Sequence, residues 1–134
     1  MFEQDYIMRQ IKEITAVIAK VMFGAKVDKS FYMLQEVERQ KAYALIQQMN
    51  NGEPKEAVEE LDRLTDNNTK ENLMIGLEFY ANLSDMDEDF LSEHGYGLVS
   101  ARRDFGRFVK KFGLEQMSEL YFGSEDDAEN NDDK

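Results

Sequence analysis

Apolar residues recur along most of this chain at intervals of three and four, and short polar segments separate the apolar runs. The first run is the longest, because Ile7, Ile11, Ile14 and Ile18 follow one another at this spacing within residues 2–23. Side chains spaced in this way lie on one face of a helix and form a stripe that packs against a core. No stretch alternates with the period of two that marks a half-buried strand. The pattern therefore predicts an all-α protein.

The clearest boundary between two helices lies at Asn50–Gly52. An apolar row ends there, and a second row that starts with Ala57 and Val58 follows Pro54. Glycine favours the left-handed conformation that ends a helix, and proline suits the first helical position because its missing N–H would have no partner there. Two helices joined by so few residues must fold back side by side. The segment 44–64 is therefore predicted to be an antiparallel helical hairpin.

The same reasoning predicts helices along the rest of the chain. They cover about residues 3–23, 30–50 (with either Asp28 or Ser30 as the cap), 54–65, 69–83, 85–93, 98–112 and 114–122. Asn68 and Ser84 are the predicted N-caps of the fourth and fifth helices, because their short polar side chains accept hydrogen bonds from free backbone N–H groups. Gly76 lies inside the fourth helix, where it costs about 1 kcal/mol relative to alanine. We therefore expect another helix to approach closely there, in a fold of six to seven helices packed as antiparallel hairpins.

Length and charge indicate one domain followed by an acidic tail. The chain has 134 residues and a formal net charge of −12, and one domain is the usual outcome at this length. Residues 124–134 contain six acids and one lysine. They hold too little apolar surface to offset the entropy of ordering them. We expect a single all-helical domain over 1–123 and an acidic, disordered tail over 124–134.

Several kinds of site and location are disfavoured by what the sequence lacks. It contains no cysteine, which removes disulfides, thiolate metal sites and cysteine nucleophiles. The first residues do not show the basic leader and apolar core of a secretory signal. No apolar run approaches the ~20 residues needed to span a bilayer. These features predict a soluble, cytoplasmic protein without membrane contact.

Candidate catalytic and metal-binding residues are few. His94 is the only histidine, and its position just before a glycine suits a hydrogen bond to the carbonyl end of a helix. The alternating acids over 85–89 resemble a calcium-binding loop, but the glycine and the terminal glutamate of such a loop are missing. No glycine-rich phosphate loop occurs. We therefore predict no enzymatic activity, no cofactor and no metal ion.

The strongest candidate for a binding site is the predicted helix over 98–112, because its two faces differ in character. Apolar residues, including Phe105 and Phe108, share one side. The other side carries the candidate ligand-binding residues Arg102, Arg103, Arg107, Lys110 and Lys111. These cations either form a solvated outer face paired with acids elsewhere in the chain, or bind an acidic peptide, phosphate or nucleic acid. In the second case the acidic tail would compete with the anionic ligand.

A smaller charged feature lies on the predicted helix over 30–50. Glu38 and Lys41 are three residues apart, on the same face as the apolar row. They either form a local ion pair worth a few tenths of a kcal/mol, or belong to a polar groove between helices.

The hairpin resembles a tetratricopeptide-repeat (TPR) unit. Gly52, Ala57 and Leu61 have the spacing of that family's turn glycine, small residue and large apolar residue. Residues 75–79, Ile-Gly-x-x-Phe, resemble the leucine, glycine and tyrosine pattern of the repeat's first helix. The resemblance implies a TPR-like right-handed stack as an alternative to a helical bundle, with ligands bound on the concave face made by first helices.

A second resemblance concerns the start of the chain. The segments 2–14 and 21–24 are similar to the start of a small uncharacterised bacterial family of all-helical proteins. Together the two resemblances imply a protein- or peptide-binding scaffold, and we predict a non-enzymatic protein-interaction module, a TPR-like scaffold or adaptor. The first helix or the aromatic-rich C-terminal helices would leave apolar surface exposed, which favours a second copy in a homodimer as the partner. The alternative is a small regulator that binds nucleic acid or another phosphate-rich or acidic ligand through the basic face of 98–112. The acidic excess of the whole chain argues against general nucleic-acid binding.

Overall fold

The structure is a computed structural model that describes residues 2–119, with side-chain surroundings for residues 6–117. The helices are α1 (Phe2–Phe23), α2 (Val27–Tyr32), α3 (Glu36–Asn50), α4 (Pro54–Leu64), α5 (Lys70–Ser84), α6 (Glu88–Glu93), α7 (Leu98–Lys111) and α8 (Glu115–Glu119). The all-α prediction is confirmed, with eight helices and no strand in the described residues, where six or seven helices were expected. The predicted tail over 124–134 lies outside the described residues.

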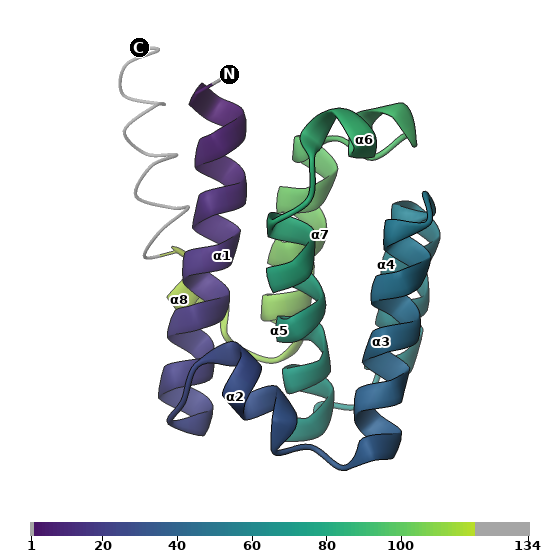
Figure 1. Ribbon diagram of the computed structural model, residues 1–134. Coiled ribbons are helices and arrows are strands. Elements are labelled where there is room, and N and C mark those ends of the chain that lie inside the picture. Colours follow the sequence, from purple (N-terminus) through teal and green to yellow (C-terminus); the bar gives the residue numbers. More distant parts are fainter. Residues whose placement is uncertain (1, 120–134) are drawn as a thin grey trace.

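The helices form a bundle around α5. In Figure 1, α1 and α8 lie on one side, α5 and α7 in the middle, and α3 and α4 on the other side, while α2 crosses the lower end. Helix α5 contacts α1, α2 and α3. Its buried residues are Leu73, Met74, Ile75, Gly76, Leu77, Phe79, Tyr80 and Leu83. A helix that is apolar on nearly all sides belongs in a core. The arrangement is consistent with a helical bundle, and TPR-like stacking is not confirmed.

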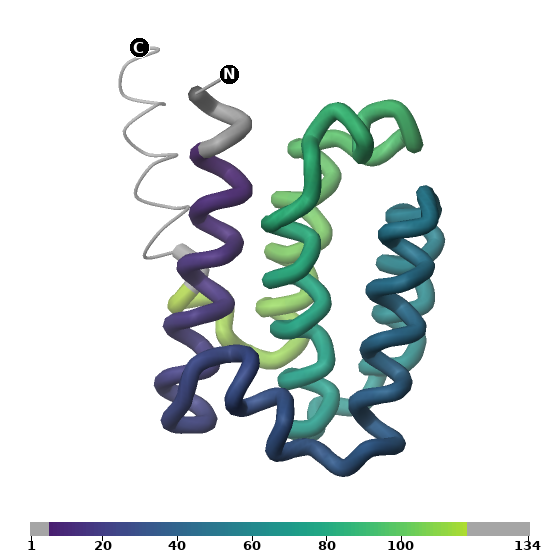
Figure 2. The backbone as a smooth tube through the Cα atoms, in the orientation of Figure 1, coloured from purple at the N-terminus to yellow at the C-terminus, as the bar shows by residue number. Residues whose placement is uncertain are grey.

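The predicted hairpin is confirmed by α3 and α4, which pack against each other. Gly52 has a φ of +101°, and its N–H donates to the carbonyl oxygen of Met49 at 3.1 Å. Pro54 is the first residue of α4. Figure 2 shows the backbone reversing direction between the two helices. The glycine and the proline therefore mark the end of one helix and the start of the next, as their conformational preferences require.

The close approach predicted at Gly76 is also confirmed. A Cβ atom at this position would lie 1.9 Å from Cζ of Phe108, so the Phe108 ring on α7 rests on the backbone of α5. Tyr80 extends the contact, because its ring centre lies 5.1 Å from that of Phe105 and 5.5 Å from that of Phe108. Aromatic rings therefore fill the space between α5 and α7.

One predicted helix is in fact two. We expected a continuous helix over 30–50, but α2 ends at Tyr32 and α3 begins at Glu36. The guanidinium of Arg39 donates to the backbone carbonyls of Tyr32 and Leu34. These hydrogen bonds satisfy groups that an unbroken helix would have paired internally. The turn redirects the chain so that both α2 and α3 bury residues in the core.

Two predicted helix starts are displaced. Thr69 caps α5 in place of Asn68, and its Oγ1 accepts a hydrogen bond from the N–H of Asn72 at 3.0 Å. Ser84, predicted to cap the next helix, is the last residue of α5, because the buried row of that helix continues up to the residue before it. Asp87 caps α6 through its side chain.

His94 holds the end of α6 against the hairpin turn. Its Nδ1 lies 2.8 Å from the carbonyl oxygen of Phe90, which confirms the predicted hydrogen bond to a helix carbonyl. The imidazole ring also lies against Gly52, where a Cβ atom would be 2.9 Å from the ring's Cδ2. The sequence did not predict this second contact, which joins α6 to the α3–α4 turn.

Candidate functional site

The basic side of α7 contacts α4 as well as solvent. The guanidinium of Arg107 bridges two carboxylates, because Nη1 donates to Oδ1 of Asp104 at 2.8 Å and Nη2 donates to Oδ2 of Asp62 at 2.5 Å. Partial burial lowers the pKa of Arg107, but hydrogen bonds to Asp62 and Asp104 outweigh this effect and raise the pKa above its usual value. Arg107 therefore ties α7 to α4.

Lys111 forms a second link between these helices. Its Nζ donates to Oγ1 of Thr65 at 2.9 Å and lies 3.9 Å from Oδ1 of Asp62. The ammonium group also lies 5.5 Å from the ring centre of Phe108 and 5.8 Å from that of Phe112, within the range of cation–π attraction. Burial lowers the pKa of Lys111. These contacts give Lys111 a structural role between α4 and α7.

Asp104 is the centre of this network. Its side chain is buried and accepts hydrogen bonds from the hydroxyl of Tyr96 at 2.8 Å, from Nε of Arg103 at 3.3 Å and from Arg107. Burial, together with the neighbouring Tyr80 and Asp104, raises the pKa of Tyr96 far above its usual value, so the hydroxyl stays protonated and donates. In contrast, the hydroxyl of Tyr80 is buried and has no hydrogen-bond partner among the described residues.

The five cations predicted to bind a ligand therefore lie in different surroundings. Arg107 and Lys111 both contact Asp62 on α4, and Arg102 is partly buried. Arg103 and Lys110 are exposed, although Arg103 also contacts a carboxylate on its own helix. An anionic ligand would have to compete with internal carboxylates for the guanidinium groups. Binding of an acidic or phosphate-rich ligand by this face stays a prediction.

A second surface is distinguished by exposed apolar side chains. Eight large apolar side chains are exposed among the described residues, and six of them lie within residues 21–43. The six are Val21, Met22, Tyr32, Met33, Val37 and Tyr43. We call the exposed side chains of residues 20–43 the α2 surface. It includes the lower end of the molecule in Figure 1, where α1 ends, α2 crosses and α3 begins. Isolated exposed apolar residues are normal, whereas several that lie close together in the fold favour a contact site. Tyr32 and Tyr43 do lie close together, because both rings pack against Phe31.

Contacts within the chain orient the side chains of the α2 surface. Nη1 of Arg39 donates to the carbonyl oxygen of Tyr32 at 3.2 Å, and the guanidinium carbon lies 6.0 Å from the Tyr32 ring centre. The buried Phe31 ring packs edge-on against Tyr32 and Tyr43, with ring centres 6.1 Å and 5.4 Å away. The pKa of Tyr43 is raised, mainly by a hydrogen bond with Tyr32 and to a smaller extent by burial. The exposed rings are therefore held by a buried ring and a guanidinium group.

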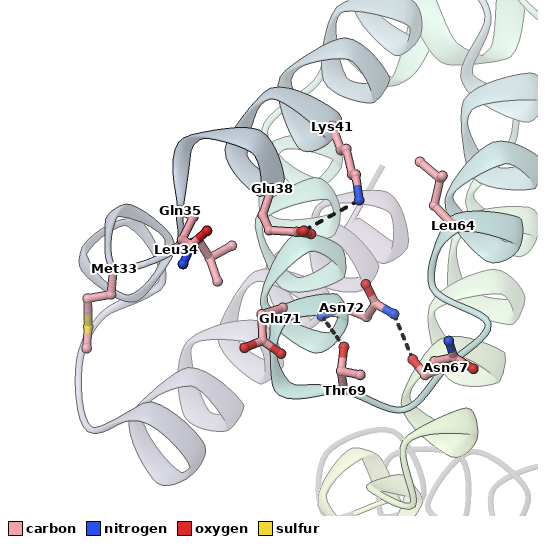
Figure 3. A pocket seen from close by; sticks show the side chains of 10 residues that line it. All are labelled: Met33, Leu34, Gln35, Glu38, Lys41, Leu64, Asn67, Thr69, Glu71 and Asn72. Carbon is pink, nitrogen blue, oxygen red and sulfur yellow. Dashed lines mark hydrogen bonds and ion pairs between the residues drawn. The ribbon is translucent and has the colours of Figure 1, made fainter.

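A groove of about 620 Å³ borders the α2 surface (Figure 3). The residues that line it are Met33, Leu34, Gln35, Glu38, Lys41, Leu64, Asn67, Thr69, Glu71 and Asn72. Met33 and Leu64 lie on opposite sides, with polar side chains between them. Lys41 pairs with Glu38 at 3.4 Å. Both alternatives for this pair are therefore confirmed, because the two residues form a local ion pair and also line a polar groove.

The sequence interpretation missed the α2 surface, although a signal for it exists. The apolar row of the predicted helix over 30–50 includes Phe31 and Leu34, whereas Tyr32, Met33 and Val37 lie off that row. A helix that packs on a core keeps its large apolar side chains on one stripe. Several large apolar residues outside the stripe are therefore the sequence feature that identifies such a surface.

Two further observations concern metal ions and membranes. Among the described residues, no group of three or more histidine, aspartate and glutamate side chains is arranged to hold a metal ion. None of the helices within residues 2–119 combines the length and the apolar character needed to cross a membrane.

Comparison with known proteins identifies a family. No curated protein and no solved structure matches the chain. A family model does match, over residues 1–121. That range includes the segment 2–14, from which we predicted membership of a family without an established activity. The chain therefore belongs to the family of unknown function DUF6483.

Proposed function

We propose that the protein is a non-enzymatic protein-interaction module that binds a partner polypeptide through the α2 surface. The observation that carries the proposal is the concentration of six exposed large apolar side chains within residues 21–43. Burying an apolar side chain of this size contributes about 1.5–3 kcal/mol of stabilisation. These six side chains do not contribute it in the isolated chain, and a partner that covers them would gain it. Tyrosine, methionine and arginine are also the residues that protein interfaces favour.

The orientation of these side chains supports the proposal. Ordering a flexible side chain at an interface costs about 0.5–1.5 kcal/mol. Tyr32 and Tyr43 are already held by Phe31, and the turn that carries Met33 is held by Arg39. A partner that binds here therefore loses less free energy to ordering than it would on a mobile surface.

The groove next to the α2 surface favours a polypeptide over a small molecule. Small-molecule sites are mainly apolar with a few converging polar groups, whereas this groove has mainly polar lining residues. The carboxamides of Gln35 and Asn67 each carry a donor and an acceptor. They therefore match the N–H and C=O groups of a peptide backbone.

Site-specific crosslinking tests the proposal. A photoreactive phenylalanine analogue replaces Met33 in one variant and Val99 in a matched control, because both side chains are highly exposed but only Met33 belongs to the α2 surface. Irradiation in an extract of the source organism should yield a defined crosslinked protein from position 33 and none from position 99. The captured protein, once purified, should bind the Val37→Asp variant at least tenfold more weakly than the wild-type chain.

The result also decides between kinds of partner. A crosslinked product made of two copies of this chain would identify the predicted homodimer. Equal capture from positions 33 and 99, or undiminished binding to the Val37→Asp variant, would contradict the proposal.

A further inference from the structure

The α2 surface differs in charge from the rest of the chain. Residues 20–43 contain the cations Lys20, Lys26, Lys29, Arg39 and Lys41 and the acids Asp28, Glu36 and Glu38. Their formal charge is +2. Since the whole chain carries −12, the remaining residues carry −14. The exposed apolar side chains therefore lie in a segment of positive charge on an otherwise acidic protein.

Three of these cations are available to a ligand. Glu38 is paired with Lys41, so these two charges offset each other. Lys20, Lys26 and Lys29 are exposed, and none of them forms an ion pair with residues 6–117, whose side-chain surroundings the structure describes. In the sequence, Lys20 directly precedes Val21 and Met22, and Lys26 and Lys29 come a few residues before Tyr32 and Met33. The acids that remain exposed in this segment are Asp28 and Glu36.

We infer that the α2 surface binds an acidic segment of another protein, in which aspartate and glutamate flank large apolar side chains. The inference rests on the proposed function and adds the chemical class of the partner. Apolar side chains of that segment cover Tyr32, Met33 and Val37, which are exposed. Its carboxylates lie near the three exposed lysines, and opposite charge speeds encounter and selects among partners.

Charge also argues against four other candidates for binding to the α2 surface: a second copy of the chain, a nucleic acid, an anionic membrane and residues 124–134 of the chain itself. In a two-fold symmetric dimer the same surface occurs on both copies, so two segments of charge +2 would face each other. A nucleic acid or an anionic membrane presents negative charge over an area larger than the α2 surface, so the −14 of the remaining residues would repel it, whereas a short acidic segment meets only the α2 surface. The acids of residues 124–134 have the right charge, but that segment contains no large apolar residue.

Two short labelled peptides test the inference by fluorescence anisotropy with the full-length protein. They share the same leucine, phenylalanine and methionine positions, and carry aspartate and glutamate in one peptide and lysine in the other. The acidic peptide should bind about tenfold tighter at low salt, and the difference should shrink as salt screens the charges. Equal affinities, tighter binding of the basic peptide, or no binding of either peptide would overturn the inference.

Charge-reversal variants locate the site. The Lys26→Glu/Lys29→Glu variant should lose the preference for the acidic peptide, while Arg9→Glu/Lys55→Glu, a matched change at exposed cations outside residues 20–43, should keep it. Circular dichroism checks that both variants are folded. A preference that persists in Lys26→Glu/Lys29→Glu would place the site elsewhere and overturn the inference.

The other occupants give distinct results. A doubled mass in sedimentation equilibrium that Met33→Asp abolishes would show a second copy on the surface. Binding to phosphatidylserine vesicles that outcompetes the acidic peptide would show a membrane contact. A large gain in peptide affinity after the acids of 124–134 are changed to amides would show that this segment occupies the surface. Each of these results overturns the inference. Specific crosslinking from position 33 without a preference for the acidic peptide would contradict only the inference, and leave the proposed function standing.

Discussion

The α4–α7 contact and the α2 surface use their side chains in opposite ways. The sequence concentrates cations on α7, yet Arg107 and Lys111 both contact Asp62 on α4. The α2 surface has fewer cations, but Lys26 and Lys29 are exposed beside apolar side chains that the core does not use. A run of charge along one helix is therefore weak support for a ligand site, because the fold supplies partners that are distant in sequence. Exposed apolar side chains, in contrast, have no partner within the fold that would explain their presence.

The largest expected effect concerns the centre of the α4–α7 network. Replacing Asp104 by alanine removes the acceptor of the Tyr96 hydroxyl and of Arg107. Breaking a buried, hydrogen-bonded pair is strongly destabilising because the remaining groups stay desolvated. We expect Asp104→Ala to lower the free energy of unfolding by about 3 kcal/mol in urea titrations.

An exposed ion pair supplies the control for Asp104. Lys12 and Asp85 lie 2.9 Å apart, and both side chains are mostly exposed. Exposed pairs contribute about 0–1 kcal/mol, so Asp85→Ala should change the stability little. Similar losses in both variants would show that the contacts of Asp104 contribute no more to the stability of the fold than an exposed ion pair does.

The next effect concerns the position of α7 on α5. Gly76→Ala would place a Cβ atom 1.9 Å from a carbon of the Phe108 ring, and overpacking of this kind costs about 1–3 kcal/mol. Gly106→Ala is the matched change on α7, because nothing lies within 4 Å of its added Cβ atom. Alanine is a better helix former by about 1 kcal/mol, so this variant should be more stable. Thermal unfolding measures both, and two changes of the same sign would contradict the packing of Phe108.

These residues also show what could be predicted from the sequence. The hairpin at Gly52 and the close approach at Gly76 follow from local preferences, since each glycine has a conformational or steric reason to be there. The pairing of Arg107 with Asp62 could not be predicted, because the two residues are 45 positions apart and only the fold brings them together. The turn after Tyr32 was missed for a similar reason, since Arg39 and the packing of α2 on the core outweigh helical spacing.

A smaller effect on stability should distinguish two buried tyrosines next to Asp104 and Arg107, because only one of them has a hydrogen-bond partner. Tyr96 donates to Asp104, whereas the hydroxyl of Tyr80 has no partner among the described residues. A hydrogen bond to a charged group is worth about 1.5 kcal/mol or more, and a buried hydroxyl without one costs about 1–3 kcal/mol. Tyr96→Phe should therefore destabilise the protein by about 1 kcal/mol, and Tyr80→Phe should stabilise it by a similar amount.

Urea titrations of the two phenylalanine variants measure this difference directly. Both substitutions remove one hydroxyl and leave the ring in place, so the comparison isolates the hydrogen bond. A loss of stability in both variants would show that the Tyr80 hydroxyl has a partner, which would enlarge the network between α4, α5 and α7.

The smallest expected effect on stability tests whether the apolar side chains of the α2 surface are exposed and do not belong to the core. Met33 and Val37 are exposed in the isolated chain, so replacing both by serine removes little buried area and should change the free energy of unfolding by less than about 0.5 kcal/mol. Val58→Ser is the matched change at a buried valine of α4, and it should cost about 2–3 kcal/mol because it leaves a cavity and buries a hydroxyl. If the double variant were as unstable as Val58→Ser, the side chains of Met33 and Val37 would belong to the core, and the proposed docking surface would have no basis. If the double variant is as stable as the wild-type chain but no longer binds the crosslinked partner, then Met33 and Val37 serve binding and contribute little to the stability of the fold.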